Sequence, residues 1–495
     1  MSRCIPAVAL LLVGCSAHAL DREMAQRSMP TPELIKAVET GLRGPVEVAG
    51  EGPSLMSLAD RMAFSKVPGV SIAVIERGAI AWTRGYGLAY GQRPVTPDTL
   101  FQSGSISKPV TAVAAMREVE AGRLDLDADV NALLRSWQIP PSPLSAAHPV
   151  TLRRLLSHSA GLTVHGFPGY EPGQPLPTLL QILQGQPPSN TGPVRVEAQP
   201  GSEWQYSGGG YQVVQQILID RWGKEFPAMV RERLFRPLAM ARSQFEQFAP
   251  GSSAVDVATG HDREGREISG RWRLFPEMAA AGMWSTPTDL ARFVIALQRA
   301  SQGIRGSVVA ATTAREIFTR QSGAWGLGFQ LEGVGTSRRF RHGGDTPGYK
   351  AVLVAYPETG QGAVIMTNGD RGYRLIDEIL QSIAAAYRWP DYGPKLKTPI
   401  RVDAAALDRV EGIYRLDALP DVRLILARRS EGLWLRIVQP AGENESELLP
   451  TSPDRFFRRD IDFELLFGPG NPAPKVTLYQ DGQTFSATRV QEPSR

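Results

Sequence analysis

The fold is decided by the stretch Phe101-Gln102-Ser103-Gly104-Ser105-Ile106-Ser107-Lys108-Pro109-Val110-Thr111. A turn-rich run passes here into an apolar segment with helical periodicity, so the pattern predicts that a helix begins at Ser105. Lys108 then lies one turn further along the same face, where its amine can reach the hydroxyl of Ser105. Such a pair is also common as a solvated helix start with serine as the N-cap, so the flanking sequence has to decide between the two interpretations.

Four further motifs follow in a fixed order. They are Leu155-Leu156-Ser157-His158-Ser159-Ala160-Gly161-Leu162, then Pro200-Gly201-Ser202-Glu203-Trp204-Gln205-Tyr206-Ser207-Gly208-Gly209-Gly210-Tyr211, then Ala280-Ala281-Gly282-Met283-Trp284-Ser285-Thr286-Pro287-Thr288-Asp289-Leu290, then Arg341-His342-Gly343-Gly344. Together with Ser105 and Lys108 they resemble the serine β-lactamase and penicillin-binding-protein superfamily, in particular its class C-like branch with esterases and D-peptidases. The resemblance covers roughly residues 60 to 390.

The resemblance implies an α/β (α+β) fold, with an antiparallel sheet flanked by helices and an all-helical subdomain. It implies that Ser105 attacks the substrate, that Lys108 accepts its proton, and that Tyr206 passes a proton to the leaving group. The oxyanion donors would be the backbone N–H groups of Ser105 and of Asp345, which follows His342, Gly343 and Gly344. No cofactor or metal is expected, and His148, His165 and His261 have no metal-ligand spacing.

The sequence departs from the family pattern at two places. Tyr-x-Asn appears as Tyr206-Ser207-Gly208, and Lys-Thr-Gly appears as His342-Gly343-Gly344. Loss of the lysine removes a fixed positive charge and so weakens recognition of the carboxylate of a β-lactam or peptide. Arg341 or a protonated His342 could compensate for that loss. We therefore expect a hydrolase of esters or D-amino-acid peptides. The alternatives are a class C-like β-lactamase and a penicillin-binding or sensor protein with little turnover.

Composition limits the partners and the compartment. The formal net charge of +4 over 495 residues, without a block of basic residues, argues against nucleic-acid binding. The resemblance implies a small-molecule ester, peptide or β-lactam as the partner. Residues 1–19 resemble a secretory signal. Cys15 ends a lipobox-like Leu12-Val13-Gly14-Cys15, whereas Ala17-His18-Ala19 fits ordinary cleavage. We expect a periplasmic protein, attached to a membrane if Cys15 is lipidated.

The predicted organisation has five parts. After residues 1–19 come a tether and first helix over 20–60, the hydrolase domain over 61–392, a linker over 393–400 and a β domain over 401–495. Helices are predicted from Ser105 to about Leu134, with a break at Gly122, and over 376–387. Strands are predicted at 70–75, 79–82, 326–329, 349–356 and 362–366. Residues 164–200, rich in Pro, Gly and Gln, predict an irregular lid or a long connection over the site, which we expect to influence substrate choice. The short alternating runs after residue 422 predict an antiparallel barrel or sandwich, which resembles the lipocalin-like module of many relatives.

Overall fold

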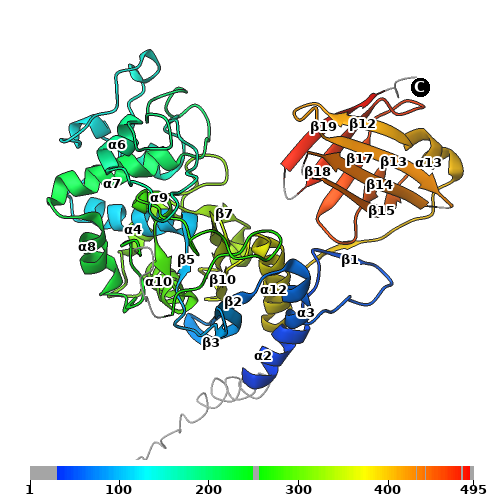
Figure 1. Cartoon of the computed structure of the whole chain (residues 1–495), viewed down its shortest axis with the longest axis horizontal. Coiled ribbons are helices and arrows are strands. Elements are labelled where there is room, and N and C mark those ends of the chain that lie inside the picture. The colour runs from blue at the N-terminus through cyan, green and yellow to red at the C-terminus, as the bar shows by residue number, and fades with distance from the viewer. Residues whose placement is uncertain (1–30, 249–255, 431, 441, 481–482, 491–495) are drawn as a thin grey trace, which may run out of the picture.

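The computed structural model describes residues 31–248, 256–430, 432–440, 442–480 and 483–490. The predicted signal segment, with Cys15, lies outside the described residues. Figure 1 shows a larger part built of a sheet and helices, and a separate β barrel formed by the C-terminal residues. This arrangement confirms the predicted fold class.

The larger part is organised around a seven-stranded antiparallel sheet with the order β4-β3-β2-β10-β9-β8-β7. Its strands are β2 (Gly69–Glu76), β3 (Ala79–Tyr90), β4 (Arg93–Pro94), β7 (Gln330–Glu332), β8 (Arg339–Thr346), β9 (Tyr349–Ala355) and β10 (Gly362–Thr367). Every residue of β9 and β10 is buried. Both faces of the sheet are therefore covered, which explains why these strands are continuous apolar runs rather than alternating ones.

The two faces of the sheet carry different helices. Val70, Ile72 and Val74 of β2 pack in one cluster with α2 (Thr31–Thr40), α3 (Leu58–Ser65) and α12 (Gly372–Tyr387). Ala73 and Ile75 point to the opposite face, as the period-2 geometry of a strand requires. That face is covered by α10 (Pro287–Ser301) and leads into the helical subdomain.

The helical subdomain adds α4 (Ser107–Glu120), α5 (Leu152–Leu156), α6 (Leu179–Gln184), α7 (Gly208–Trp222), α8 (Phe226–Val230), α9 (Met278–Ala281) and α11 (Ala311–Ile317). A small pair, β5 (Phe101–Gln102) with β6 (Trp284–Ser285), brings the sequence before α4 beside the sequence before α10. Thr286 caps α10, because its hydroxyl accepts a hydrogen bond from the N–H of Asp289 at 3.2 Å.

Several element predictions are correct and three need correction. The hairpin around Gly78, the helix over 376–387 and the strands at 349–356 and 362–366 are confirmed within a few residues. The helical stretch predicted from Ser105 ends at Glu120, next to the predicted break at Gly122, but the stretch predicted from there to about Leu134 contains only a 3-10 turn at Val130–Ala132. The strand predicted at 326–329 is a turn, in which the N–H of Gly326 donates to Phe329 O at 2.9 Å. Residues 164–200 are largely irregular, as predicted, but they include α6 with a capping box at Thr178.

The C-terminal part is a closed antiparallel barrel of eight strands, β12 to β19. They are β12 (Gly412–Leu416), β13 (Arg423–Arg429), β14 (Gly432–Gln439), β15 (Gly442–Ser452), β16 (Arg455–Phe457), β17 (Phe463–Phe467), β18 (Lys475–Gln480) and β19 (Gln483–Val490). Helix α13 (Ala404–Val410) contributes Leu407 and Val410 to the buried core of the barrel. The closure removes every free strand edge, which is the usual solution for a small all-β module.

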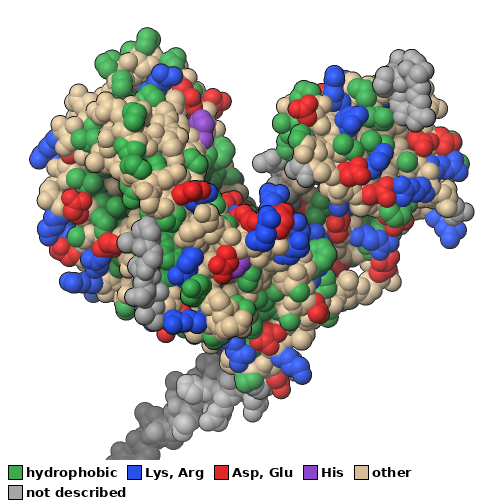
Figure 2. All heavy atoms as spheres, viewed as in Figure 1, with side chains coloured by type: hydrophobic (Ala, Val, Ile, Leu, Met, Phe, Trp, Pro, Cys, Tyr) green, Lys and Arg blue, Asp and Glu red, His purple; other side chains and the backbone are tan. Residues whose placement is uncertain are grey.

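An N-terminal segment joins the two parts. Strand β1 (Val46–Val48) pairs in parallel with β11 (Lys395–Lys397), so both the expected tether and the expected linker contain a strand. Val46 and Val48 pack against Phe457 of the barrel. Lys395 and Asp462 form an ion pair at 2.6 Å across the same junction. On the face seen in Figure 2 a deep recess separates the two parts above this junction.

Candidate active site

Ser105 lies in a 3-10 turn, Gly104–Ile106, that runs directly into α4. It is the one residue of the run 101–110 that is not buried. Ser107 fixes this turn, because its hydroxyl donates to Gly104 O at 2.6 Å and accepts from the N–H of Met283 at 3.0 Å. The hydroxyl of Ser105 is therefore presented at a helix start whose backbone is held from both sides.

Lys108 lies one turn further along and reaches Ser105, as the spacing predicts. Its Nζ donates to Ser105 Oγ at 3.0 Å and to Ala280 O at 2.8 Å. The side chain is 2% exposed, and burial lowers the pKa of Lys108 to about 7. Its amine is therefore neutral in a large fraction of molecules at neutral pH, which is the state in which an amine can accept a proton from a hydroxyl.

Tyr206 comes from the turn just before α7 and faces the same pair. The Nζ of Lys108 lies 4.8 Å from the centroid of the Tyr206 ring. Burial raises the pKa of Tyr206, and a hydrogen bond with the side chain of Ser105 offsets part of that rise. The phenol consequently keeps its proton near neutral pH and can act as a donor.

His158 lies under Tyr206 and supports it. Its ring stacks on the Tyr206 ring, and its Nδ1 accepts the N–H of Ser207 at 3.1 Å. Burial, and then the charges of Lys108 and His342, hold the pKa of His158 well below its usual range. Its Nε2 has no hydrogen-bond partner among the described residues. The neutral imidazole of His158 therefore packs against one face of the Tyr206 ring.

Strand β8 brings the other predicted residues to the turn that carries Ser105. β7 pairs with β8 only over Arg339 to Arg341, which leaves the later part of that edge of β8 facing the turn. A Cβ added at Gly344 would lie 2.0 Å from Ser103 O, and a Cβ at Gly104 would lie 2.7 Å from the backbone nitrogen of Asp345. The two backbones touch, so glycine is required at both positions. The backbone nitrogens of Ser105 and Asp345 therefore belong to adjoining segments.

Ion pairs support this strand from the side of β9. Lys350 is buried and its Nζ lies 2.8 Å from Asp345 Oδ1 and 2.9 Å from Asp370 Oδ1. Asp370 also accepts the N–H of Gly348 in the turn between β8 and β9 at 2.8 Å. The end of β8 next to Ser105 is therefore held by these ion pairs as well as by its pairing with β9.

His342 cannot supply the positive charge that the sequence allowed for. It is 4% exposed, its Nδ1 lies 2.6 Å from Gly343 O, and burial lowers the pKa of His342 to about 3. Arg341 points to the other face of the sheet, because side chains alternate along β8. Its Nη1 lies 3.6 Å from Glu332 Oε1, beside a cavity between α12 and the barrel. The prediction that a protonated His342 compensates for the missing lysine charge is therefore wrong.

The place of the family's asparagine is filled by an aromatic ring. A Cβ added at Gly208 would lie 2.7 Å from Cε2 of Phe167, which belongs to the irregular segment 164–200. An asparagine side chain would not fit here unless Phe167 moved. The substitution thus exchanges an amide for an apolar wall, supplied by the segment that was expected to influence substrate choice.

Three residues of the site had no motif to reveal them. Trp325 packs edge-on against His158 and His342, and it stacks on the exposed Trp204 with ring centroids 5.6 Å apart. His165 holds the backbone of Tyr206, because its Nδ1 lies 2.7 Å from Tyr206 O. Tyr373, from the first turn of α12, approaches Gly343 from the opposite face of the sheet. Only tertiary packing brings these aromatic residues to the site, which explains why local sequence does not predict them.

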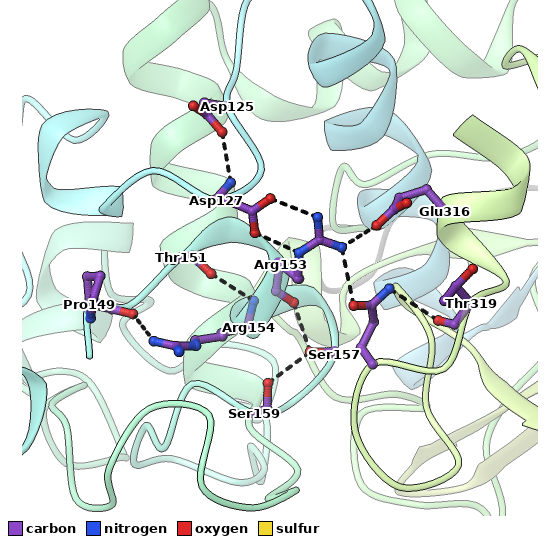
Figure 3. Close-up of polar contacts among 11 residues, drawn as sticks. Asp125, Asp127, Pro149, Thr151, Arg153, Arg154, Ser157, Ser159, Glu316 and Thr319 are labelled. Atoms are coloured by element: carbon purple, nitrogen blue, oxygen red, sulfur yellow. Dashed lines mark hydrogen bonds and ion pairs between the residues drawn. The ribbon is translucent and has the colours of Figure 1, made fainter. Parts of the chain in front are cut away.

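Helix α5, which ends just before His158, is anchored by the network drawn in Figure 3. Arg153 binds Asp127 through two hydrogen bonds of 2.6 and 2.8 Å and also contacts Glu316. Ser157 closes the helix by donating to Arg153 O at 2.8 Å. The network ties the first turn of α5 to α11, and α5 leads directly to His158 beneath Tyr206.

Within the part of the chain that the structure describes, no group of three His, Cys, Asp or Glu residues could hold a metal ion. Among the same residues, no helix is both long enough and apolar enough to cross a bilayer.

Comparison with known proteins agrees with this geometry. The sequence profile of the Beta-lactamase family matches residues 57–386, more than half of the chain. Penicillin-binding protein 4 from Amycolatopsis lactamdurans is 26% identical over 368 residues, covering 69% of this chain and 92% of that protein. Esterase EstB from Burkholderia gladioli is 29% identical over 302 residues, covering 52% of this chain and 74% of that protein. D-aminopeptidase from Gluconobacter oxydans is 29% identical over 181 residues, covering 36% of this chain and 32% of that protein.

Solved structures agree on the fold. The octameric penicillin-binding protein homologue from Pyrococcus abyssi superposes with a TM-score of 0.59 at 23% identity, covering 87% of this chain and 98% of that chain. D-amino acid amidase from Ochrobactrum anthropi SV3 gives a TM-score of 0.56 at 23% identity, covering 72% and 99%. The profile match over residues 57–386 establishes that the chain belongs to the Beta-lactamase family and is a serine hydrolase of that family, with an esterase and a D-aminopeptidase among its relatives.

Proposed function

We propose that this protein is an exported hydrolase that cleaves an ester or a D-amino-acid peptide bond through an acyl-enzyme on Ser105. The observation that carries the proposal is the 3.0 Å contact between Lys108 Nζ and Ser105 Oγ, made by a lysine that is 2% exposed. A buried amine beside an accessible hydroxyl is the arrangement that activates a serine without a histidine.

In the proposed reaction Ser105 Oγ attacks the substrate carbonyl carbon and its proton passes to neutral Lys108. The carbonyl oxygen becomes an oxyanion, which the N–H groups of Ser105 and Asp345 stabilise. The bond to the leaving group then breaks, and the leaving group takes a proton from Tyr206, which recovers one from Lys108. Water next attacks the acyl carbon and gives its proton to the same pair, which releases the acid and restores Ser105.

Two features of the site support esters or peptides over β-lactams. Phe167 occupies the space where an asparagine would bind a substrate amide, and the neutral His342 replaces a lysine that would bind a carboxylate. The related esterase and D-aminopeptidase act on substrates of the first kind, as their names state.

The test is intact mass spectrometry after exposure to a fluorophosphonate, to benzylpenicillin and to a p-nitrophenyl ester. The wild type should gain one fluorophosphonate adduct and Ser105→Ala none. Ser103→Ala, which removes a buried hydroxyl without a hydrogen-bond partner among the described residues, should keep the adduct. Release of p-nitrophenol without a lasting penicillin adduct supports the proposal. A lasting penicillin adduct without turnover would instead favour a penicillin-binding or sensor protein, and rapid penicillin hydrolysis would favour a β-lactamase.

Export is a separate proposal, supported by the apolar run and small residues before Leu20. In a Gram-negative host fed a labelled fatty acid, the full chain should incorporate the label in a membrane fraction, and Cys15→Ala should not. An unlabelled periplasmic protein that begins at Leu20 would favour cleavage after Ala19 and contradict the lipoprotein. A cytoplasmic full-length chain would overturn export itself.

A further inference from the structure

The candidate active site continues on one side into a pair of stacked tryptophans. Trp204 and Trp325 lie with their ring centroids 5.6 Å apart and their ring planes inclined by 23°. Both rings stand beside the phenol of Tyr206, at centroid distances of 6.4 Å for Trp204 and 6.0 Å for Trp325. Tyr206 in turn lies against Lys108, whose Nζ is 3.0 Å from Ser105 Oγ. The tryptophan pair therefore borders the reacting groups.

One face of the Trp204 ring is open. Trp325 covers the face on which it stacks, whereas His158 and Tyr206 approach Trp204 at steep ring angles of 81° and 55°. The residue is nevertheless 40% exposed, although aromatic side chains gain much of their stabilising effect from burial. Because an indole ring has two faces, the face turned away from Trp325 is the one on which a further ring can stack.

The backbone that carries the two tryptophans is held by hydrogen bonds. The N–H of Gln205, next to Trp204, donates to His158 O at 2.7 Å. The N–H of Trp325 donates to Ser322 O at 2.9 Å. Trp325 also packs edge-on against the buried ring of His158. The open face is consequently ordered before any ligand arrives, which reduces the entropy lost on binding.

The charges around this cluster favour an uncharged ring over a cation. His158 and His342 are buried, and burial holds the pKa of each imidazole below its usual range, so both are neutral at pH 7. Lys108 already places an amine 4.8 Å from the centroid of the Tyr206 ring. A cationic substrate group on Trp204 would bring a second positive charge to the same cluster, whereas a neutral aromatic ring would not.

Resting on the proposed function, we propose that Trp204, backed by Trp325, binds an uncharged aromatic ring of the substrate by stacking. The preferred substrates are then esters or amides that carry an aryl group near the scissile bond, either in the acyl part or in the leaving group. In this assignment Trp204 determines specificity and takes no part in proton transfer.

The experiment compares two pairs of esters. Ethyl phenylacetate and ethyl cyclohexylacetate vary the acyl part, and benzyl propionate and cyclohexylmethyl propionate vary the leaving group. Trp204→Leu should lower kcat/KM about fivefold for the aromatic member of at least one pair, because a stacked ring is lost. The saturated member of that pair should stay within about twofold. The pair that responds shows on which side of the scissile bond the ring lies.

Each rate is referred to the wild-type rate on the same ester, so differences in intrinsic reactivity cancel. Trp204→Phe, which keeps a ring, should retain most of the preference. Because Trp204 is exposed, both variants should remain folded, and thermal denaturation checks this. Trp434→Leu is the matched control, since Trp434 is a half-buried tryptophan of β14 in the barrel. It should change no ester selectively.

Three outcomes of Trp204→Leu would overturn the inference. Equal losses on both members of each pair would show that Trp204 only positions Tyr206, and wild-type rates on all four esters would show that no ring stacks on it. A selective loss on choline propionate, relative to 3,3-dimethylbutyl propionate, would show a cation site instead. Failure of the proposed function looks different: the wild type would hydrolyse none of the esters, or Ser105→Ala would hydrolyse them as well.

Discussion

The imidazole of His158 stacks on the phenol of Tyr206, with ring centroids 4.2 Å apart and ring planes inclined by 28°. The same histidine accepts the N–H of Ser207, so it holds both the ring and the backbone of the turn that presents Tyr206. Its own backbone has a φ of +58°, a conformation that asparagine tolerates better than most residues.

His158→Asn should therefore remove the stacked ring while keeping the backbone conformation and an acceptor for Ser207. We expect the free energy of unfolding to fall by about 1 kcal/mol, the typical value of an aromatic pair, and kcat/KM for an ester to fall about tenfold. Urea denaturation and steady-state kinetics measure the two effects. His148→Asn, at an exposed histidine, is the control. Wild-type kinetics in His158→Asn would show that Tyr206 does not need this support.

Activity should rise with pH through the titration of Lys108. Burial lowers the pKa of this amine to about 7, and only the neutral amine accepts the Ser105 proton. The reactive fraction, and with it kcat/KM, should increase about tenfold between about pH 6 and pH 8 and then level off. Burial lowers the pKa of His342 to about 3, so that residue does not titrate in this interval. Rates corrected for spontaneous hydrolysis that are flat or fall with pH would contradict the assignment of Lys108 as the base.

Adjacent glycines on β8 should respond in opposite ways to alanine. Gly344→Ala places a methyl group 2.0 Å from Ser103 O, a backbone atom that cannot move without displacing the turn at Ser105. We expect a loss of about 3 kcal/mol in the free energy of unfolding, together with loss of fluorophosphonate labelling.

Gly343→Ala places its methyl group 3.1 Å from Tyr373 Oη, the far end of a side chain that can shift. This variant should remain folded and should still be labelled by the fluorophosphonate. Thermal denaturation and intact mass provide both readouts. Equal behaviour of the two variants would mean that β8 does not contact the Ser105 turn as closely as described.

Arg153 and Arg154 offer a second matched pair. Arg153→Met removes the links from α5 to Asp127 and Glu316, whereas Arg154→Met removes a contact with the carbonyl of Pro149. Because a hydrogen bond to a charged group contributes about 1.5 to 3 kcal/mol, we expect Arg153→Met to lower the free energy of unfolding by about 2 kcal/mol. Since α5 positions His158, kcat should fall in this variant as well. An equal effect of Arg154→Met would indicate a general charge effect rather than the links of Arg153 to Asp127 and Glu316 that Figure 3 shows.

Local chemistry explains how much of this fold the sequence predicts. The spacing of Ser105 and Lys108 on one helix turn, the apolar runs of β9 and β10 and the cap at Thr286 are local features, and all three are found in the structure. The glycines of the segment 326–329 form a turn because Gly328 has a φ of +87° and its N–H donates to Leu156 O. That partner is distant in sequence, so periodicity alone predicted a strand there.

The parts of the site that sequence did not predict depend on contacts between distant elements. Tyr373 reaches Gly343 only because α12 packs on β9, and Phe167 reaches Gly208 only because an irregular segment folds over α7. The charge of His342 could not be assigned either, since its pKa depends on how deeply Trp325 and the neighbouring elements bury it. The roles of Ser105, Lys108, Tyr206 and Asp345 remain predictions that the experiments above address.

The central pairing of the sheet has a consequence for the order of folding. The backbone N–H of Gly69 donates to Asn368 Oδ1, between residues 299 positions apart, and β2 pairs with β10 in the same region. During synthesis, β2 and β3 therefore emerge long before the strand that covers their other edge. Contacts of such sequence separation form late, because the intervening chain must first be ordered. The hairpin of β2 and β3 cannot pair with β10 until nearly the whole domain has been synthesised. Until then the unpaired edge of β2 remains accessible to chaperones or to other chains.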